Sequence, residues 1–211
     1  MPSRTSRLLS GGKLDIDSGI GAVFWGAVTI FYVVQHGEKE RLPGDPGLTD
    51  LGRWQADRTA MWLRQAEVMS VFSSPMRRAR ETADLIASVI NTPVREDTRL
   101  RERMNWDGSQ PFDEFLTEWA ASVRDRDFVP QAGDSSRQAG ERFRSFLRDV
   151  ATGPEVIVVC THGGVTVDLL RTLVGDQELD PRLLAEGIPS CAITTLQDQT
   201  VLDIASVNHL E

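Results

Sequence analysis

The chain has 211 residues, of which 40% are hydrophobic and 26% are charged, and its formal net charge is −8. This length and composition predict one globular domain, or one domain with a small appendage. The negative charge argues against a general nucleic-acid binder, which normally presents a basic surface. Two cysteines, Cys160 and Cys191, are too few for a disulfide framework and are predicted to be buried free thiols.

The first 27 residues match no later pattern, and we interpret residues 1–27 as an N-terminal extension of unknown role before a single domain at 28–211. Ile20 to Val34 is a run of fifteen residues without a charge. A membrane span needs about 20 apolar residues, and Asp15 and Asp17 interrupt the basic flank that a signal peptide would have. We therefore expect an ordered lead into the first strand, no membrane partner and a cytoplasmic protein.

Two predicted strands end in the same way. The apolar run Thr29 to Val34 is followed by Gln35-His36-Gly37-Glu38, and the run Val156 to Thr161 by His162-Gly163-Gly164. Such runs are typical of strands buried on both faces of a parallel sheet, and open α/β sheets bind ligands at the carboxyl ends of their strands. Because the chain has only three histidines, two in matching positions predict a shared site.

Between these strands, a loop from Lys39 to Gly47 leads into a helix capped by Thr49 or Asp50. The apolar positions of that helix are Leu51, Ala56, Met61, Trp62 and Leu63, and Val68 to Phe72 is a short strand. Ser73-Ser74-Pro75 then predicts a second helix with a serine cap and proline at its first position. Arg77, Arg78 and Arg80 either form a solvated face or include one member of an anion site at the helix start, and we favour the anion site.

The rest of the chain continues the alternation of strands and helices. Val94 begins a short strand, and a rather polar helix from 112 to about 126 lies in a predicted cap insertion at about 104–134. Ser135 or Ser136 starts a helix with the apolar stripe Ala139, Phe143, Phe146, Leu147 and Val150. A helix from Val165 to Val174 and a hairpin at 192–196 and 201–207 follow. This order predicts an α/β fold, a three-layer α/β/α sandwich with a mostly parallel central sheet.

The motifs resemble those of the histidine phosphatase superfamily, the phosphoglycerate-mutase-like enzymes. The family opens with a strand and Arg-His-Gly-Glu, and its later motifs follow here in family order from about residue 28 to the C-terminus. The matching segments are Gln35 to Glu38, Leu48 to Ala56, Ser73 to Ala83, Leu100 to Glu102, Thr161 to Gly164 and Ile188 to Thr194.

The resemblance implies a metal-independent phosphomonoesterase of the histidine acid phosphatase type, acting on a small phosphorylated substrate through a phosphohistidine. It implies His36 as the nucleophile, Arg78 and His162 as holders of the phosphoryl oxygens, and Glu102 as the general acid and base. Gln35, Gly37 and Gly163 complete the expected phosphate-binding set. No metal or nucleotide cofactor is implied. An alternative for Glu102 is a strand-edge charge between Arg101 and Arg103.

Position 35 departs from the family, which has arginine there. Glutamine offers only a neutral amide, so the change is expected to cost a few kcal/mol of transition-state binding, about two orders of magnitude in rate. Lys39, Arg41 or Arg77 could compensate for the missing charge.

Two interpretations of the function therefore stay open. One is a phosphatase with altered activity, and the other is a catalytically impaired relative that binds a phosphorylated ligand or partner protein. A phosphoglycerate-type mutase is less favoured, because Lys39 to Gly47 lacks the Trp-Asn element of mutases. The sequence indicates neither the substrate nor the oligomeric state.

Overall fold

One six-stranded sheet organises the part of the chain that the computed structural model describes, residues 28–211. The predicted extension at 1–27 and the first part of the uncharged run lie outside the described residues. The strand order is β3-β2-β4-β1-β5-β6, with parallel pairing from β3 through β1 and antiparallel pairing of β5 with β1 and β6. The strands are β1 (Ile30–Gln35), β2 (Ser70–Ser73), β3 (Val94–Glu96), β4 (Val156–Thr161), β5 (Ile193–Gln197) and β6 (Thr200–Ser206).

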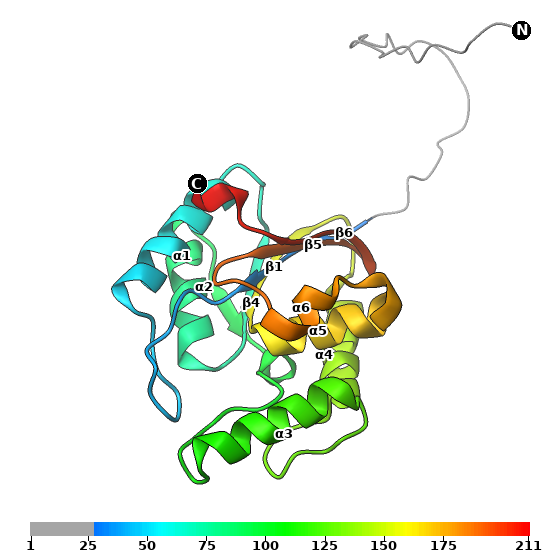
Figure 1. The fold of residues 1–211 in the computed structure, drawn as a ribbon. Coiled ribbons are helices and arrows are strands. Elements are labelled where there is room, and N and C mark those ends of the chain that lie inside the picture. The colour runs from blue at the N-terminus through cyan, green and yellow to red at the C-terminus, as the bar shows by residue number, and fades with distance from the viewer. Residues whose placement is uncertain (1–27) are drawn as a thin grey trace, which may run out of the picture.

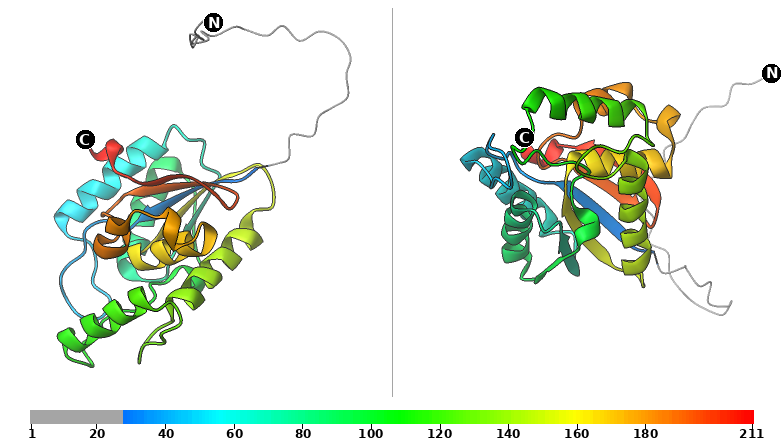
Figure 2. Two further views of the ribbon diagram at one scale, coloured as in Figure 1. Left: turned by 45° about the vertical axis from the view of Figure 1, so that its right-hand side comes forward. Right: turned by 90° about the horizontal axis from the view of Figure 1, so that it is seen from below.

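Helices cover both faces of this sheet (Figures 1 and 2). Helices α1 and α2 pack on one face and α4 and α5 on the other, whereas α3 lies outside both layers. The predicted α/β/α sandwich with a mostly parallel sheet and a C-terminal hairpin is confirmed. The α-helices are α1 (Asp50–Leu63), α2 (Arg77–Ile90), α3 (Phe112–Arg124), α4 (Ser136–Val150), α5 (Gly163–Leu173) and α6 (Pro181–Glu186), and the 3₁₀ helices are η1 (Thr98–Leu100), η2 (Asp176–Glu178) and η3 (Asn208–Leu210).

The two central strands are buried on both faces, as predicted. On β1, Phe31 and Val33 belong to the hydrophobic cluster under α4 and α5, whereas Val34 belongs to the cluster under α1 and α2. Side chains of β4 divide in the same way, which follows from the two-residue period of a strand. Cys160 and Cys191 are buried free thiols, which confirms that prediction.

Two of the three predicted helix caps are confirmed. Thr49 caps α1 by accepting from the N–H of Gly52, and Ser135 forms a capping box with Gln138 at the start of α4. The serine cap of α2 is wrong, because that helix begins only at Arg77 and its N-cap makes no side-chain hydrogen bond. Ser74, which precedes this helix, instead contacts His162 at the end of β4, as described below.

The predicted apolar face of α1 is partly wrong. Ala56 and Leu63 are buried, but Leu51, Met61 and Trp62 are each about half exposed. The helix instead packs through small residues, which lets it lie close to α2 and the sheet. Among the described helices, none combines the length and the apolar character that crossing a membrane requires.

Candidate active site

His36 follows β1 directly, and hydrogen bonds fix which of its ring nitrogens carries the proton. Its Nδ1 lies 2.7 Å from the carbonyl oxygen of Gly37. Because a carbonyl only accepts hydrogen bonds, Nδ1 carries the proton and Nε2 keeps its lone pair. Burial and the nearby guanidinium of Arg78 lower the pKa of His36 from 6.5 to about 3. The imidazole is therefore neutral near pH 7, and its Nε2 can act as a nucleophile.

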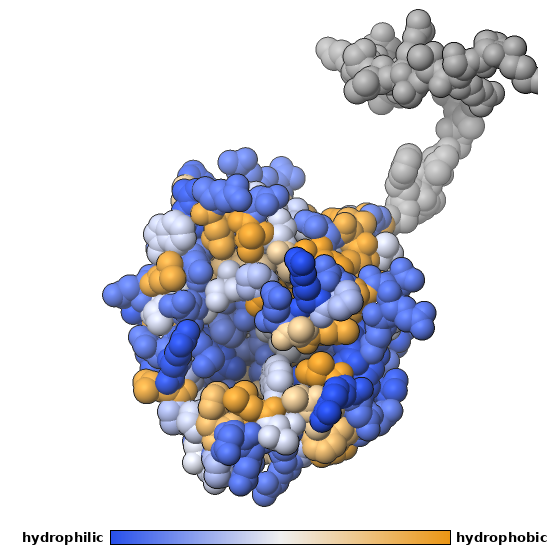
Figure 3. Space-filling model, in the orientation of Figure 1, coloured by the Kyte–Doolittle hydropathy of each residue, from blue (hydrophilic) through white to orange (hydrophobic). Residues whose placement is uncertain are grey.

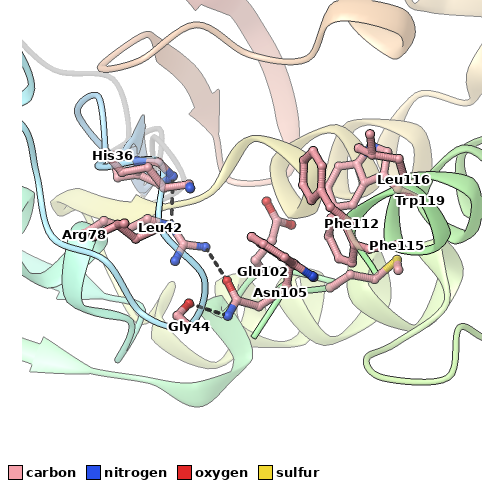
Figure 4. A pocket seen from close by; sticks show the side chains of 13 residues that line it. His36, Leu42, Gly44, Arg78, Glu102, Asn105, Phe112, Phe115, Leu116 and Trp119 are labelled. Atoms are coloured by element: carbon pink, nitrogen blue, oxygen red, sulfur yellow. Dashed lines mark hydrogen bonds between the residues drawn. The ribbon is translucent and has the colours of Figure 1, made fainter. Parts of the chain in front are cut away.

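Arg78, in the first turn of α2, is only 3% exposed and donates through Nε to Nε2 of His36 (3.2 Å). One terminal nitrogen donates to Asn105 (3.3 Å), which donates to the carbonyl of Gly44 (2.7 Å), as drawn in Figure 4. The other terminal nitrogen lies 3.7 Å from a carboxylate oxygen of Asp45 and has no hydrogen-bond partner within residues 28–211. A phosphoryl oxygen beside His36 would satisfy this buried donor.

The other two arginines of that turn do not contribute to the site. Arg77 pairs with Glu81 (2.7 Å) and Arg80 with Asp84 (2.9 Å), both on the exposed side of the helix. Of the three arginines considered for an anion site, the structure places only Arg78 beside the nucleophile.

The parallel pairing of β1 with β4 brings the two predicted histidines together. Gln35 at the end of β1 lies opposite Thr161 at the end of β4, so the residues that follow are neighbours. The ring centroids of His36 and His162 are 5.2 Å apart. Burial and Arg78 lower the pKa of His162 well below 6.5, so this second ring is also neutral.

His162 is held by a serine that the sequence analysis assigned to a helix cap. Its Nε2 lies 2.8 Å from the hydroxyl of Ser74, whose oxygen already accepts a bond from the N–H of Met76. When the hydroxyl hydrogen is donated to Nε2, the proton of His162 lies on Nδ1. That Nδ1 is buried and without a hydrogen-bond partner in the described part of the chain.

Glu102 follows η1 and belongs to no strand, so the alternative of a strand-edge charge is wrong. Its carboxylate accepts from the backbone N–H groups of Gly164 (3.0 Å), Val165 (2.8 Å) and Arg103 (2.8 Å). The first two lie at the start of α5, where the helix favours negative charge. A Cβ on Gly164 would lie 2.6 Å from both the Glu102 carboxylate and the Trp119 ring. Glycine at this position therefore lets the Glu102 carboxylate and the Trp119 ring pack against the start of α5.

The remaining predicted phosphate-binding residues lie close by, with different roles. The amide nitrogen of Gln35 is 3.4 Å from the nucleophilic nitrogen, and its Oε1 is buried without a hydrogen-bond partner among residues 28–211. Gly163 and Gln35 both border a neighbouring cavity of about 210 Å³. The N–H of Gly37 donates to the hydroxyl of Thr82 (3.1 Å), so it is not available to a phosphate in this arrangement.

Position 37 also requires glycine for a steric reason. A Cβ there would lie 2.4 Å from the carbonyl oxygen of Gly52 in α1. The backbone just after the nucleophile therefore packs directly against the start of that helix.

Lys39 is the only one of the three proposed replacement cations that borders the same cavity as His36 and Arg78. Burial and the charge of Arg78 lower the pKa of Lys39, which indicates that its ammonium lies within reach of the arginine's field. Arg41 is exposed, and Arg77 is paired as described above.

These side chains border a cavity of about 270 Å³ (Figure 4). We call His36, Lys39, Arg78 and Glu102 its floor, and the apolar group Trp106, Phe112, Phe115, Leu116 and Trp119 its roof. Leu42, Gly44, Met104 and Asn105 complete the lining. In the space-filling view the molecule is hollowed on this face, and hydrophobic residues gather over α3 (Figure 3).

Sequence reasoning missed several of these residues. Ser74 and Asn105 are held by contacts with residues that are distant in the sequence, and no local sequence pattern predicts these contacts. The roof did leave a signal, because Phe112, Phe115, Leu116 and Trp119 are spaced i, i+3, i+4 and i+7, the pattern of one helix face. The sequence analysis described this helix only as rather polar.

Comparison with known proteins finds similar sequences and similar solved structures. A relative from Mycolicibacterium vanbaalenii, glucosyl-3-phosphoglycerate phosphatase, is 29% identical over 164 residues, covering 68% of this chain and 73% of its own. Phosphoglycerate mutase-like protein 4 from Arabidopsis thaliana is 34% identical, covering 85% and 86%. The structure of mycobacterial glucosyl-3-phosphoglycerate phosphatase with inorganic phosphate superposes with a TM-score of 0.65 at 25% identity, covering 86% and 96%.

A family model for the histidine phosphatase superfamily (branch 1) matches residues 31–200, which include every residue of the cavity floor. The relatives thus comprise phosphatases and phosphoglycerate mutase-like proteins. The chain belongs to the histidine phosphatase superfamily.

Proposed function

We propose that this protein is a phosphatase that hydrolyses a small phosphomonoester through a phosphohistidine at His36. The observation that carries the proposal is the neutral imidazole whose Nε2 faces a buried guanidinium with an unsatisfied donor. A nucleophile beside a fixed cation is the arrangement that phosphoryl transfer needs, because positioning and charge stabilisation supply most of its catalysis.

In the first step, Nε2 of His36 attacks phosphorus while the bond from phosphorus to the leaving oxygen breaks. Protonated Glu102 gives its proton to that oxygen, and the alcohol departs. In the second step, water attacks the phosphohistidine, Glu102 takes the proton from the water, and the bond from nitrogen to phosphorus breaks. Nδ1–H of His36 stays bonded to the Gly37 carbonyl throughout, so the ring needs no tautomer change.

Charge on the transferring group is stabilised by the cations of the floor. Arg78 supplies a fixed fork of donors, and Nδ1–H of His162 supplies a neutral donor. We assign the second positive charge to Lys39, in place of the arginine that the family has at position 35. These groups are the basis for proposing a reaction that needs no added metal.

Gln35 favours a second candidate, a protein that binds a phosphorylated ligand or partner with little turnover. The amide beside His36 is neutral, and a charge-assisted hydrogen bond is roughly twice as strong as a neutral one. The two candidates differ in whether a phosphohistidine forms.

The test is hydrolysis of an aryl phosphate in the presence of EDTA, combined with trapping of the ³²P-labelled enzyme by rapid denaturation. Wild type is expected to turn over and to carry an acid-labile label, and His36→Asn to lose both. His209→Asn, which changes the third histidine at its distant contact with Thr59, is the matched control and should retain both. Phosphate binding without a label in the wild type would favour the second candidate and contradict the enzyme.

A further inference from the structure

The roof of the cavity is apolar and faces the nucleophile across the space that a leaving group would occupy (Figure 4). Four of its side chains come from one face of α3, and its rings contact one another in sequence. The ring centroids of Trp106 and Phe112 are 4.9 Å apart, those of Phe112 and Phe115 6.2 Å, and those of Phe115 and Trp119 6.1 Å. This is an aromatic surface suited to a flat or apolar group.

Two members of the roof are unusually exposed for their size. Phe112 is 51% and Leu116 47% exposed, although both border a cavity. Apolar surface at the mouth of a cavity is covered favourably by an apolar ligand, because water leaves both surfaces.

The roof also lacks any group that would bind an anionic leaving group. Residues 104–123 contain four carboxylates and no lysine, arginine or histidine. Among residues 28–211, the only cations that border the cavity are Lys39 and Arg78, and both belong to the floor, where the phosphoryl group would occupy them. A carboxylate on the leaving group would therefore face aromatic rings and the carboxylate of Glu102.

One further cation near the roof, Arg103, is paired with a buried carboxylate. The guanidinium of Arg103 stacks on the Trp119 ring at 4.3 Å and pairs with the buried carboxylate of Asp168 at 2.6 Å. It is 2% exposed and does not border this cavity. Arg103 therefore orients the tryptophan and does not reach the leaving group.

We propose that the preferred substrate is a monoester of phosphate with an uncharged aromatic or apolar alcohol, bound with its phosphoryl group on the floor and its alcohol under the roof. This inference rests on the proposed function, since it names the leaving group of that reaction. It separates this chain from the relative named for a phosphoglycerate compound, whose glycerate carries a carboxylate.

The first measurement compares kcat/KM for 1-naphthyl phosphate and 3-phosphoglycerate. The naphthyl ester is expected to be preferred by about 100-fold or more, given what apolar pockets discriminate. In Leu116→Arg this preference should fall about tenfold, chiefly through a lower KM for 3-phosphoglycerate, because a cation then faces its carboxylate. The matched control is Leu202→Arg, at an equally exposed leucine on β6, and it should leave the preference unchanged.

Binding of inert analogues tests the same preference without turnover. Calorimetry with naphthylmethylphosphonate and 3-phosphonopropionate should show tighter binding of the aromatic compound to His36→Asn as well as to wild type. Equal or tighter binding of the carboxylated analogue, or an unchanged preference in Leu116→Arg, overturns the inference even if the enzyme is a phosphatase. Tighter aromatic binding without turnover or label overturns the proposed function while supporting the roof assignment.

Discussion

The floor and the roof of the cavity are built on different principles. His36 follows β1 and Arg78 lies at the start of α2, and these two floor residues are buried and joined by a hydrogen bond. Four of the five roof side chains are carried by α3, which lies outside the layers of the sandwich, and the rings among them contact one another. In the reaction that we propose, chemistry thus rests on the buried, hydrogen-bonded part of the cavity, whereas substrate choice rests on the more exposed part, which sequence change can alter at little cost.

Removing the buried cation of the floor should have the largest effect on activity. Arg78→Gln keeps some hydrogen bonding but loses the charge, and we expect kcat to fall by about 10²–10³. Arg80→Gln, in the same helical turn but paired at the surface, should change kcat less than about twofold. Equal losses in both variants would show that helix stability, and not phosphoryl binding, is being measured.

The second-largest effect on activity is expected at Gly164, which lies against Glu102 of the floor and Trp119 of the roof. Gly164→Ala puts a methyl group 2.6 Å from both the Glu102 carboxylate and the Trp119 ring, so both must move. We expect kcat to fall by about 10- to 100-fold, since the acid–base group is misplaced. Gly153→Ala is the control, because no atom lies within 4 Å of its added Cβ. Full activity in Gly164→Ala would contradict the role of Glu102.

The buried neutral side chain of His36 should also make the stability of the fold depend on pH. The pKa of His36 is lowered from 6.5 to about 3, so the unfolded chain takes up a proton that the folded protein excludes. Stability is then lost as the pH falls below 6.5, by about 2 kcal/mol at pH 5 from this residue alone. Urea unfolding of wild type and His36→Asn between pH 7.5 and 5 should show the smaller loss in the variant, and parallel curves would refute the assignment.

The smallest effect concerns the replacement of the family arginine. Lys39→Met should lower kcat/KM by about tenfold, because a partly solvated cation stabilises the phosphoryl charge less than a buried one. Gln35→Arg introduced into Lys39→Met should restore activity if the two cations are interchangeable. Arg41→Met, at the exposed neighbour, is the control. Failure of Gln35→Arg to restore activity would indicate that Lys39 acts through the fold of the loop.

The sheet and the positions of the two histidines could be predicted because they depend on short-range patterns. Continuous apolar runs define β1 and β4, and parallel pairing then forces His36 and His162 to the same edge. The capping box at the start of α4 and the C-terminal hairpin are similarly local. These features need no knowledge of side-chain packing.

Other parts depend on contacts between distant segments and could not be read from the sequence. Ser74 has the pattern of a helix cap, but its hydroxyl contacts His162, and α2 starts two residues later than the pattern indicates. Leu51 and Met61 look like core positions, yet small residues let α1 approach the sheet so closely that they remain outside. The proposed replacement of the family arginine at position 35 by Lys39 depends on how one loop folds over the site.

The contact of Gly37 with Gly52 bears on the timing of catalysis. With no room for a Cβ between these backbones, and with Nδ1 bound to the Gly37 carbonyl, the imidazole is fixed before any substrate arrives. A nucleophile that is already immobile has little rotational entropy left to lose on the way to the transition state. In the proposed reaction, folding and not substrate binding thus supplies the ordering of the attacking nitrogen, so we expect a small substrate with few contacts still to be attacked efficiently.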